Sequence, residues 1–279
     1  MRVGVLNGWL SQRYLPFWET YFRALEVDIV HPEATAVALP FPAPIRRLLG
    51  QVYSLKTQGV DYLLLPDVQL GREAQKGNPL PWLVGLEETL KRLIPGLPPT
   101  LVVPAELYPE VAGLAAKIGQ SLTQNPMLAR RALERTKHLL HPSFTAPKQG
   151  GVYLVGLVAQ PMLLCDEEWL ASVRTALDTR GLSLFLADKA PAELRQEGAH
   201  LGLGLELPTD LEAAGMHRYL SRLGKVKGLL YIHEAKYLPL PTPLRKSLKK
   251  APPSKPWRMA GLEAPWNQIA DELAKDLQV

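Results

Sequence analysis

Short apolar segments alternate with longer amphipathic segments along most of the chain. Phe17, Tyr21 and Leu25 recur at every fourth position, which is the spacing of one face of an α-helix. The apolar segments are shorter and end at Pro, Gly or Asp, as β-strands commonly do. The first part of the chain is therefore predicted to contain strands at residues 2–6, 27–30, 60–65 and 100–103 and helices at 17–25, 45–57 and 82–93.

The alternation stops over residues 106–140, which are predicted to be helical, and restarts after a segment containing Pro, Ser and Gly at 141–151. Strands are expected at 152–158, 182–186, 226–232 and 258–262, and helices at 166–179, 191–197, 209–223, 243–250 and 263–277. Strands that alternate with helices of this length form a parallel sheet covered by helices. We therefore expect an α/β fold of two Rossmann-like parallel-sheet domains, at 1–105 and 149–279, joined by a helical connector and linker at 106–148.

Ligands of such sheets bind beyond the carboxyl ends of the strands, so the loops there are the first place to look for a site. Asn7 and Gly8 follow the first strand, where small residues let a backbone approach a ligand. Asp67 follows the third strand and Asp166 lies in the loop after the fifth. Asp67 suits a ribose contact or a general base, although a turn or a helix cap is the commoner role of such a residue.

Three arginines, Arg13, Arg46 and Arg72, are placed to face the same loops of the first domain. An arginine there can grip a phosphate or a carboxylate with two parallel hydrogen bonds. Simple solvation is the commoner role for any one of them. The candidate ligand-binding residues are Asn7, Gly8, Arg13, Arg46, Asp67 and Asp166.

The amino-acid composition excludes several kinds of site. Cys165 is the only cysteine, so the chain cannot form an internal disulfide or supply a set of thiolates to a metal. No set of histidines has the spacing of a metal site, and no apolar segment reaches the roughly 20 residues of a membrane span. The formal net charge of +5 suits an anionic ligand without requiring one. We expect a cytoplasmic protein with no metal, no cofactor and no membrane contact.

Several blocks resemble one known family. The block YLPFW at residues 14–18 is similar to the motif that opens the D-component-like subunits of 2-hydroxyacyl-CoA dehydratases and their uncharacterised relatives. Gly50-Gln51 and Asp166 also resemble positions of that family. Further similar blocks are PAPIR at 42–46, GVDYLLLP at 59–66, PMLL at 161–164 and KGLLY at 227–231. The likeness covers most of the chain, and the first block is the most specific.

The resemblance implies a radical dehydration of 2-hydroxyacyl-CoA thioesters at a [4Fe–4S] cluster held by cysteines. One of those cysteines falls at Pro42 here, a second falls near Leu80-Pro81, and a third has no counterpart within residues 233–241. Pro and Leu supply no ligand atom to iron. We therefore expect a cluster-free relative that is not a radical dehydratase.

Three functions remain open. The first is a binding or accessory protein that holds an acyl-CoA-like or other phosphorylated ligand in an interdomain cleft, as a homo-oligomer or a partner subunit. The second is an enzyme of another class that uses the same cleft, with Asp67 or Glu234 as general base and its other catalytic residues unknown. The third is weak contact with nucleic acid through the basic run from Arg245 to Lys255. Such runs are usually solvated, so nucleic acid is not the partner we expect first.

Overall fold

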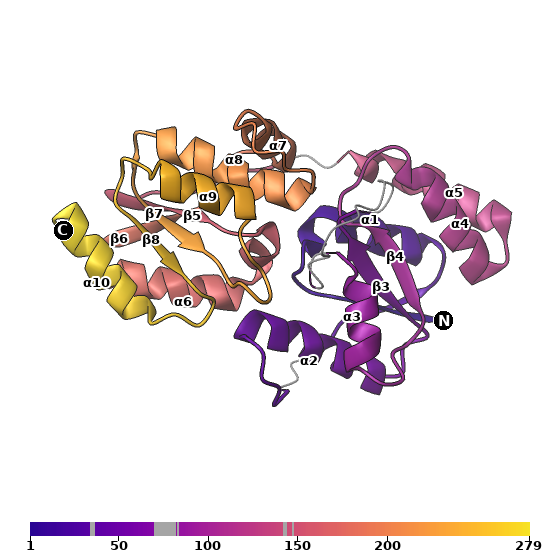
Figure 1. The fold of residues 1–279 in the computed structure, drawn as a ribbon. Coiled ribbons are helices and arrows are strands. Elements are labelled where there is room, and N and C mark those ends of the chain that lie inside the picture. The colour runs from indigo at the N-terminus through magenta and orange to yellow at the C-terminus, as the bar shows by residue number, and fades with distance from the viewer. Residues whose placement is uncertain (34–36, 70–81, 83, 142–143, 147) are drawn as a thin grey trace. The chain divides into compact units, whose positions relative to one another are not determined.

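A computed structural model describes residues 1–33, 37–69, 82, 84–141, 144–146 and 148–279. The chain divides into two compact units. The first comprises residues 1–41 and 45–143, and the second comprises residues 42–44 and 144–279 (Figure 1). No helix within these described ranges is long and apolar enough to cross a membrane.

The first unit contains a sheet in which four parallel strands take the order β2-β1-β3-β4. Val3 of β1 pairs with Ile29 of β2 on one side and with Tyr62 of β3 on the other. The elements are β1 (Arg2–Val5), α1 (Ser11–Ala24), β2 (Asp28–Val30), α2 (Ala43–Thr57), β3 (Tyr62–Asp67), α3 (Leu86–Leu93), β4 (Thr100–Pro104), α4 (Val111–Thr123), α5 (Pro126–Thr136) and the 3-10 helix η1 (Lys137–Leu140).

Helix α1 begins earlier than the sequence pattern indicated, at Ser11 rather than at Phe17. Pro16 lies inside the helix, on its exposed side. Pro16 is the sixth residue of the helix, so it removes one intrahelical hydrogen bond, the one that an N–H at this position would donate to the Gln12 carbonyl. The helix nevertheless begins before this proline, directly after the loop that follows β1.

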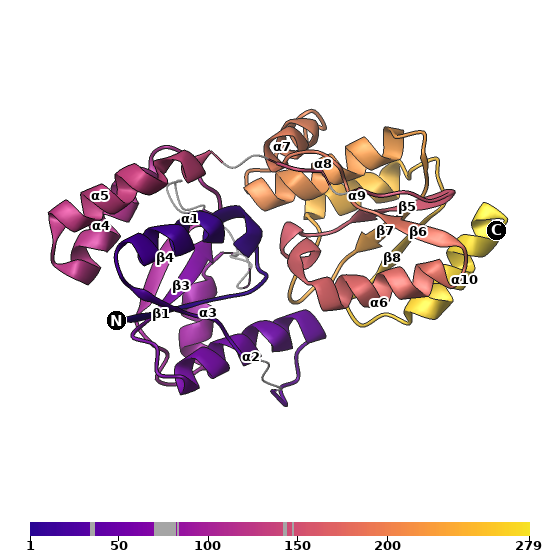
Figure 2. The same cartoon turned by 180° about the vertical axis from the view of Figure 1, so that it is seen from behind.

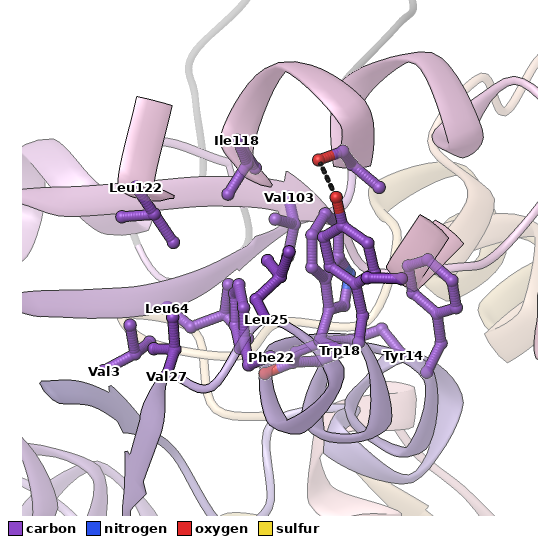
Figure 3. Close-up of a cluster of buried hydrophobic side chains, with 14 of the residues drawn as sticks. Val3, Tyr14, Trp18, Phe22, Leu25, Val27, Leu64, Val103, Ile118 and Leu122 are labelled. Carbon is purple, nitrogen blue, oxygen red and sulfur yellow. Dashed lines mark hydrogen bonds between the residues drawn. The ribbon is translucent and has the colours of Figure 1, made fainter. Parts of the chain in front are cut away.

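The aromatic residues of α1 build the main core of the first unit. Tyr14, Phe17, Trp18, Tyr21 and Phe22 are all fully buried. They pack together with side chains from the sheet and from α4 and α5. Figure 3 shows part of this cluster, with side chains of α1 near Val103 of the sheet and Ile118 of α4. The YLPFW block thus has a structural role, because aromatic rings of this size contribute strongly to a core.

Helices α4 and α5 belong to this core, whereas the sequence pattern predicts a connector between domains at residues 106–148. Val111, Ala115, Ile118 and Leu122 recur at helical spacing along α4, and all four are buried in the cluster around α1. The Tyr21 hydroxyl also donates a hydrogen bond to the Ala115 carbonyl over 2.8 Å. These two helices cover α1 because their apolar stripe has to be buried somewhere.

The second unit repeats the arrangement, with four parallel strands in the order β6-β5-β7-β8. Helices α6 and α10 cover one face of this sheet, and α8 and α9 cover the other (Figure 2). The elements are β5 (Tyr153–Val158), the 3-10 helix η2 (Pro161–Cys165), α6 (Glu167–Asp178), β6 (Leu182–Phe185), α7 (Pro191–Ala199), α8 (Pro208–Arg222), β7 (Val226–Ile232), α9 (Thr242–Lys250), β8 (Trp257–Ala260) and α10 (Trp266–Leu277).

The two sheets share one topology. In each, the second strand lies on one side of the first, and the chain then crosses to place the third and fourth strands on the other side. The prediction of an α/β protein with two Rossmann-like parallel-sheet units is confirmed. In both units, the order places a switch point beside the first strand, where the connections leave in opposite directions.

Candidate functional site

The candidate site lies at the carboxyl edge of the first sheet, where β1 and β3 end side by side. This is the topological switch point of the first unit, the position at which open α/β sheets bind ligands. Residues 6–10 leave β1 there, and Asp67 closes β3. Of the six predicted ligand-binding residues, Asn7, Gly8, Arg13, Arg46 and Asp67 belong to elements of the first unit.

A left-handed turn links β1 to α1. Gly8, Trp9 and Leu10 have φ angles of 86°, 52° and 68°, and the Ser11 N–H donates to the Gly8 carbonyl over 2.9 Å. A residue with a side chain strains the backbone by about 1–2 kcal/mol in this conformation. Trp9 and Leu10 are 7% and 1% exposed, and their burial offsets that strain. The packing thereby fixes a turn that the backbone alone would avoid.

Gln51 of α2 holds the same loop from the other side. Its Oε1 accepts a hydrogen bond from the Asn7 N–H over 2.8 Å, and its Nε2 donates to the Asn7 carbonyl over 2.9 Å. The Ser11 hydroxyl oxygen accepts from the Gly8 N–H over 3.0 Å. In the sequence, Gln51 stands out only as part of the resemblance, because nothing in the local pattern indicates that it reaches a residue 44 positions away.

Arg13 lies in the first turn of α1 and contacts Glu106, which follows β4. The Arg13 Nη1 and Glu106 Oε1 atoms are 3.2 Å apart, with side chains 20% and 29% exposed. Arg46, in the first turn of α2, donates from Nη1 to the Phe41 carbonyl over 2.8 Å. Both guanidinium groups are half-buried. Arg72 lies outside the described residues.

Asp67 forms a local turn. Its Oδ1 accepts a hydrogen bond from the Gln69 N–H over 2.7 Å, and its own carbonyl accepts from the Ala105 N–H over 2.9 Å. An aspartate that bonds a backbone N–H two residues ahead stabilises a turn. Asp67 therefore stabilises a turn, which is the commoner of the roles that the sequence leaves open for it.

Asp166 belongs to the second unit and caps a helix. Its Oδ1 accepts a hydrogen bond from the Trp169 N–H over 3.0 Å at the start of α6. Cys165, just before it, is half-buried, and its Sγ lies 3.8 Å from the Pro161 carbonyl. The role of Asp166 as the N-cap of α6 explains its position without a bound ligand.

The second sheet has its own switch point, at the carboxyl ends of β5 and β7. Gln160, two residues after the end of β5, is fully buried and donates from Nε2 to Asp210 Oδ1 over 2.8 Å and to the Pro239 carbonyl over 2.9 Å. Burial raises the pKa of Asp210, and the bond from Gln160 opposes that rise. Through these contacts, Gln160 links the start of α8 to the loop after β7.

His233 and Glu234 follow β7 at that edge. The His233 Nδ1 accepts a hydrogen bond from the Leu240 N–H over 3.2 Å, so the other ring nitrogen carries the proton in the neutral form. Burial, helped by Arg245, lowers the pKa of His233, while Glu234 opposes that effect. The backbone of Glu234 bridges to Leu238 in a short hairpin. The pair therefore shapes the loop.

Within the described ranges, no group of three or more His, Cys, Asp or Glu side chains is arranged to hold a metal ion. The position at which the resemblance placed one cluster cysteine, Pro42, is a buried proline, and the Leu80-Pro81 position lies outside the described residues. No protein-family model and no curated protein matches this chain.

Proposed function

We propose that the first unit binds a phosphorylated small molecule, of the acyl-CoA-like class, at the carboxyl edge between β1 and β3. The observation that carries this proposal is the left-handed turn of Gly8, Trp9 and Leu10, which Gln51 holds in place at the start of α1. Strained backbone that the surrounding packing maintains is typical of functional sites.

The start of α1 supplies the chemistry for an anion. The helix has 14 residues, and Leu10 at its N-cap makes no side-chain capping bond. The first turn carries the positive end of the helix dipole, although its Ser11 and Arg13 N–H groups already donate to the Gly8 and Leu10 carbonyls. Phosphate groups bind at such helix starts in α/β proteins. Arg13 adds a guanidinium to the same turn, and Asn7 is exposed in the loop that precedes the helix.

The relation to 2-hydroxyacyl-CoA dehydratase subunits is part of the same proposal. It is supported by the two parallel-sheet units and by Gln51, a residue of the resembling Gly50-Gln51 pair that orders the candidate site. The burial of Phe17 and Trp18 explains the strongest block of the resemblance by packing alone. We propose a binding role without cluster chemistry, as a homo-oligomer or with a partner subunit.

The geometry supports neither Asp67 nor Glu234 as a general base. Asp67 uses one carboxylate oxygen to hold its own turn, and Glu234 belongs to a loop of the other unit. A general base must lie within hydrogen-bond reach of the proton that it removes. Binding is therefore the function that the geometry of the first unit supports best.

Calorimetric titration of the purified chain with coenzyme A and with inorganic phosphate tests the proposal. Coenzyme A should bind, and Arg13→Ala should weaken it about tenfold or more, the effect of losing a hydrogen bond to a charged group. Arg92→Ala is the matched control, because Arg92 is exposed in the last turn of α3, at the opposite edge of the same sheet. The proposal fails if coenzyme A does not bind, or if both variants weaken it equally.

A further inference from the structure

One stretch of the second unit is strongly segregated in charge. Seven basic residues and no acidic residue lie between Glu234 and Glu263. The whole chain carries 32 basic and 27 acidic residues, so this stretch departs from the balance elsewhere. The structure shows which of the seven charges are already used within the fold.

Four of the seven have structural partners, and one of these is Arg245, whose Nη2 donates to the Thr242 Oγ1 over 3.1 Å. Lys255 donates from Nζ to the Leu220 and Leu223 carbonyls over 2.9 and 2.7 Å. These are carbonyls at the end of α8, which lack partners within the helix. Arg258 pairs with Glu272 and Asp276 of α10, at 2.7 Å in each case. Lys236 lies 5.2 Å from the centre of the Tyr237 ring.

The other three, Lys246, Lys249 and Lys250, lie on α9, which also carries Arg245. Leu244 and Leu248 are buried in the core of the second unit and fix which side of the helix faces outward. Lys246, Lys249 and Lys250 are exposed, and their spacing of three and four residues places them on one face. Within the described part of the chain, the ammonium groups of these three lysines make no hydrogen bond or ion pair. Their face of α9 is therefore positively charged and uncompensated.

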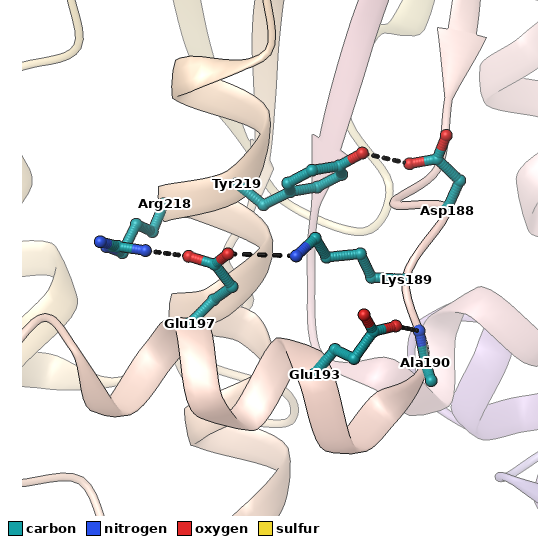
Figure 4. Close-up of polar contacts among 7 residues, drawn as sticks. All are labelled: Asp188, Lys189, Ala190, Glu193, Glu197, Arg218 and Tyr219. Atoms are coloured by element: carbon teal, nitrogen blue, oxygen red, sulfur yellow. Dashed lines mark hydrogen bonds and ion pairs between the residues drawn. The ribbon is translucent and has the colours of Figure 1, made fainter.

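Other cations of the second unit contrast with these lysines. Figure 4 shows Lys189 and Arg218 contacting the same Glu197 carboxylate, the Lys189 pair at 3.1 Å. Lys225 contacts Asp188 at 3.2 Å. Although burial opposes ionisation, hydrogen bonds from these cations help to lower the pKa of both carboxyl groups. The fold neutralises positive charge there and leaves it free on α9.

We infer that the face of α9 formed by Lys246, Lys249 and Lys250 binds the phosphate backbone of nucleic acid without sequence preference. Contacts to phosphates need only positive charge within reach, and they dominate non-specific affinity. This inference concerns the second unit and is independent of the proposed function of the first.

The make-up of the face separates nucleic acid from the other anionic partners. A helix that binds a membrane surface inserts apolar side chains, but the leucines of α9 point into the protein core. A protein interface is centred on apolar or aromatic residues, and the exposed side of α9 offers lysines instead. The phosphate backbone of nucleic acid can be bound by lysines alone, without exposed apolar or aromatic side chains.

Three phosphate contacts give weak binding that depends steeply on salt. The logarithm of the association constant should fall with the logarithm of the salt concentration with a slope of about −2 to −3. Binding should therefore be measurable at low salt and should fade toward physiological ionic strength.

The experiment is fluorescence anisotropy of a labelled oligonucleotide, single-stranded and duplex, at roughly 50 to 200 mM salt. The full chain is compared with a variant carrying Lys246→Gln, Lys249→Gln and Lys250→Gln. The control carries Lys117→Gln, Lys148→Gln and Lys275→Gln, three exposed lysines in other parts of the chain. Both variants remove the same charge, so the comparison separates a local site from the effect of net charge. Circular dichroism checks that both variants are folded.

The α9 variant should lose about tenfold or more in affinity at low salt, and its salt slope should move toward zero. The control should stay within about threefold of the unmodified chain. Equal losses in both variants would overturn the inference, and so would the absence of binding at the lowest salt. Binding to vesicles of anionic lipid, dependent on the same lysines and without binding to the oligonucleotide, would assign the face to membranes instead.

Discussion

Replacing Gln51 with alanine removes the clamp on the loop between β1 and α1. The wild-type amide makes two hydrogen bonds to the backbone of Asn7, at 2.8 and 2.9 Å, from a helix that is distant in sequence. Alanine favours the helical conformation, so α2 itself should remain intact. The effect of Gln51→Ala should therefore fall on the loop.

The magnitude follows from the exposure of these bonds. A hydrogen bond within a protein contributes about 0.5–1.5 kcal/mol net, because the unbonded groups bind water instead. Asn7 is exposed, so water can replace the lost partners and each bond belongs near the lower end of that range. Gln51→Ala should cost about 1–2 kcal/mol in the local stability of the loop. That loss corresponds to a change of roughly five- to thirtyfold in its opening equilibrium.

Hydrogen exchange measured by mass spectrometry on peptides covering the first loop is the direct assay, because it reports local opening. The loop peptide should exchange faster in Gln51→Ala by the factor given above, and peptides of the second unit should be unchanged. Gln120→Ala is the control, since Gln120 is an exposed residue of α4. It should leave exchange in the loop unchanged.

Gln51→Glu sharpens the test. The carboxylate still accepts from the Asn7 N–H, but it has no proton to donate to the Asn7 carbonyl and repels it. The folded state therefore favours the protonated form, which raises the pKa of the introduced carboxyl. The stabilising bond is present at low pH and is lost as the pH rises through that pKa. Protection of the loop should recover below about pH 4. Equal exchange in wild type, Gln51→Ala and Gln51→Glu at neutral pH would refute the role assigned to Gln51.

Two further predictions concern stability. Gly119→Ala places a methyl group against the Tyr21 hydroxyl and should cost about 1–3 kcal/mol, measured by denaturant titration. In a Tyr21→Phe background the same change should cost less, and an equal cost in both would contradict this packing account. Burial lowers the pKa of His217, which contacts Tyr231 over 2.8 Å, from 6.5 to about 4. The unfolded chain therefore takes up this proton first as the pH falls, so stability should drop by roughly 2–3 kcal/mol between pH 6.5 and 4. His217→Gln should flatten that part of the stability curve; an unchanged curve would disprove the assignment.

The sequence by itself was sufficient for the fold class, because that information is local. Alternation of short apolar segments with amphipathic ones determines which segments are strands and which are helices. The start of α5 is local in the same way, since the Asn125 cap and the following Pro126 act within one turn. The start of α1 was missed because it depends on the packing of Trp9 and Leu10, which the local pattern does not contain.

Part of the candidate site was also readable from the sequence. The carboxyl ends of parallel strands meet at one edge, so Asn7, Gly8 and Asp67 could be placed near one another from the strand pattern alone. Their partners could not. Gln51 lies 44 residues from Asn7, and Glu106 lies 93 residues from Arg13. Only the folded chain brings these pairs within hydrogen-bond distance.

The tertiary structure alone decided how the apolar faces and the charges are used. Periodicity shows that α4 has an apolar stripe, but it does not show that the stripe covers α1 and makes residues 106–140 part of the first unit. The basic run from Arg245 to Lys255 looks uniform in the sequence. The fold gives Lys255 the end of α8 as its partner and leaves Lys246 exposed. The pattern of residues along a chain determines local conformation. The hydrogen-bond and packing partners of a side chain lie in distant segments, and they come into contact only when the core is assembled.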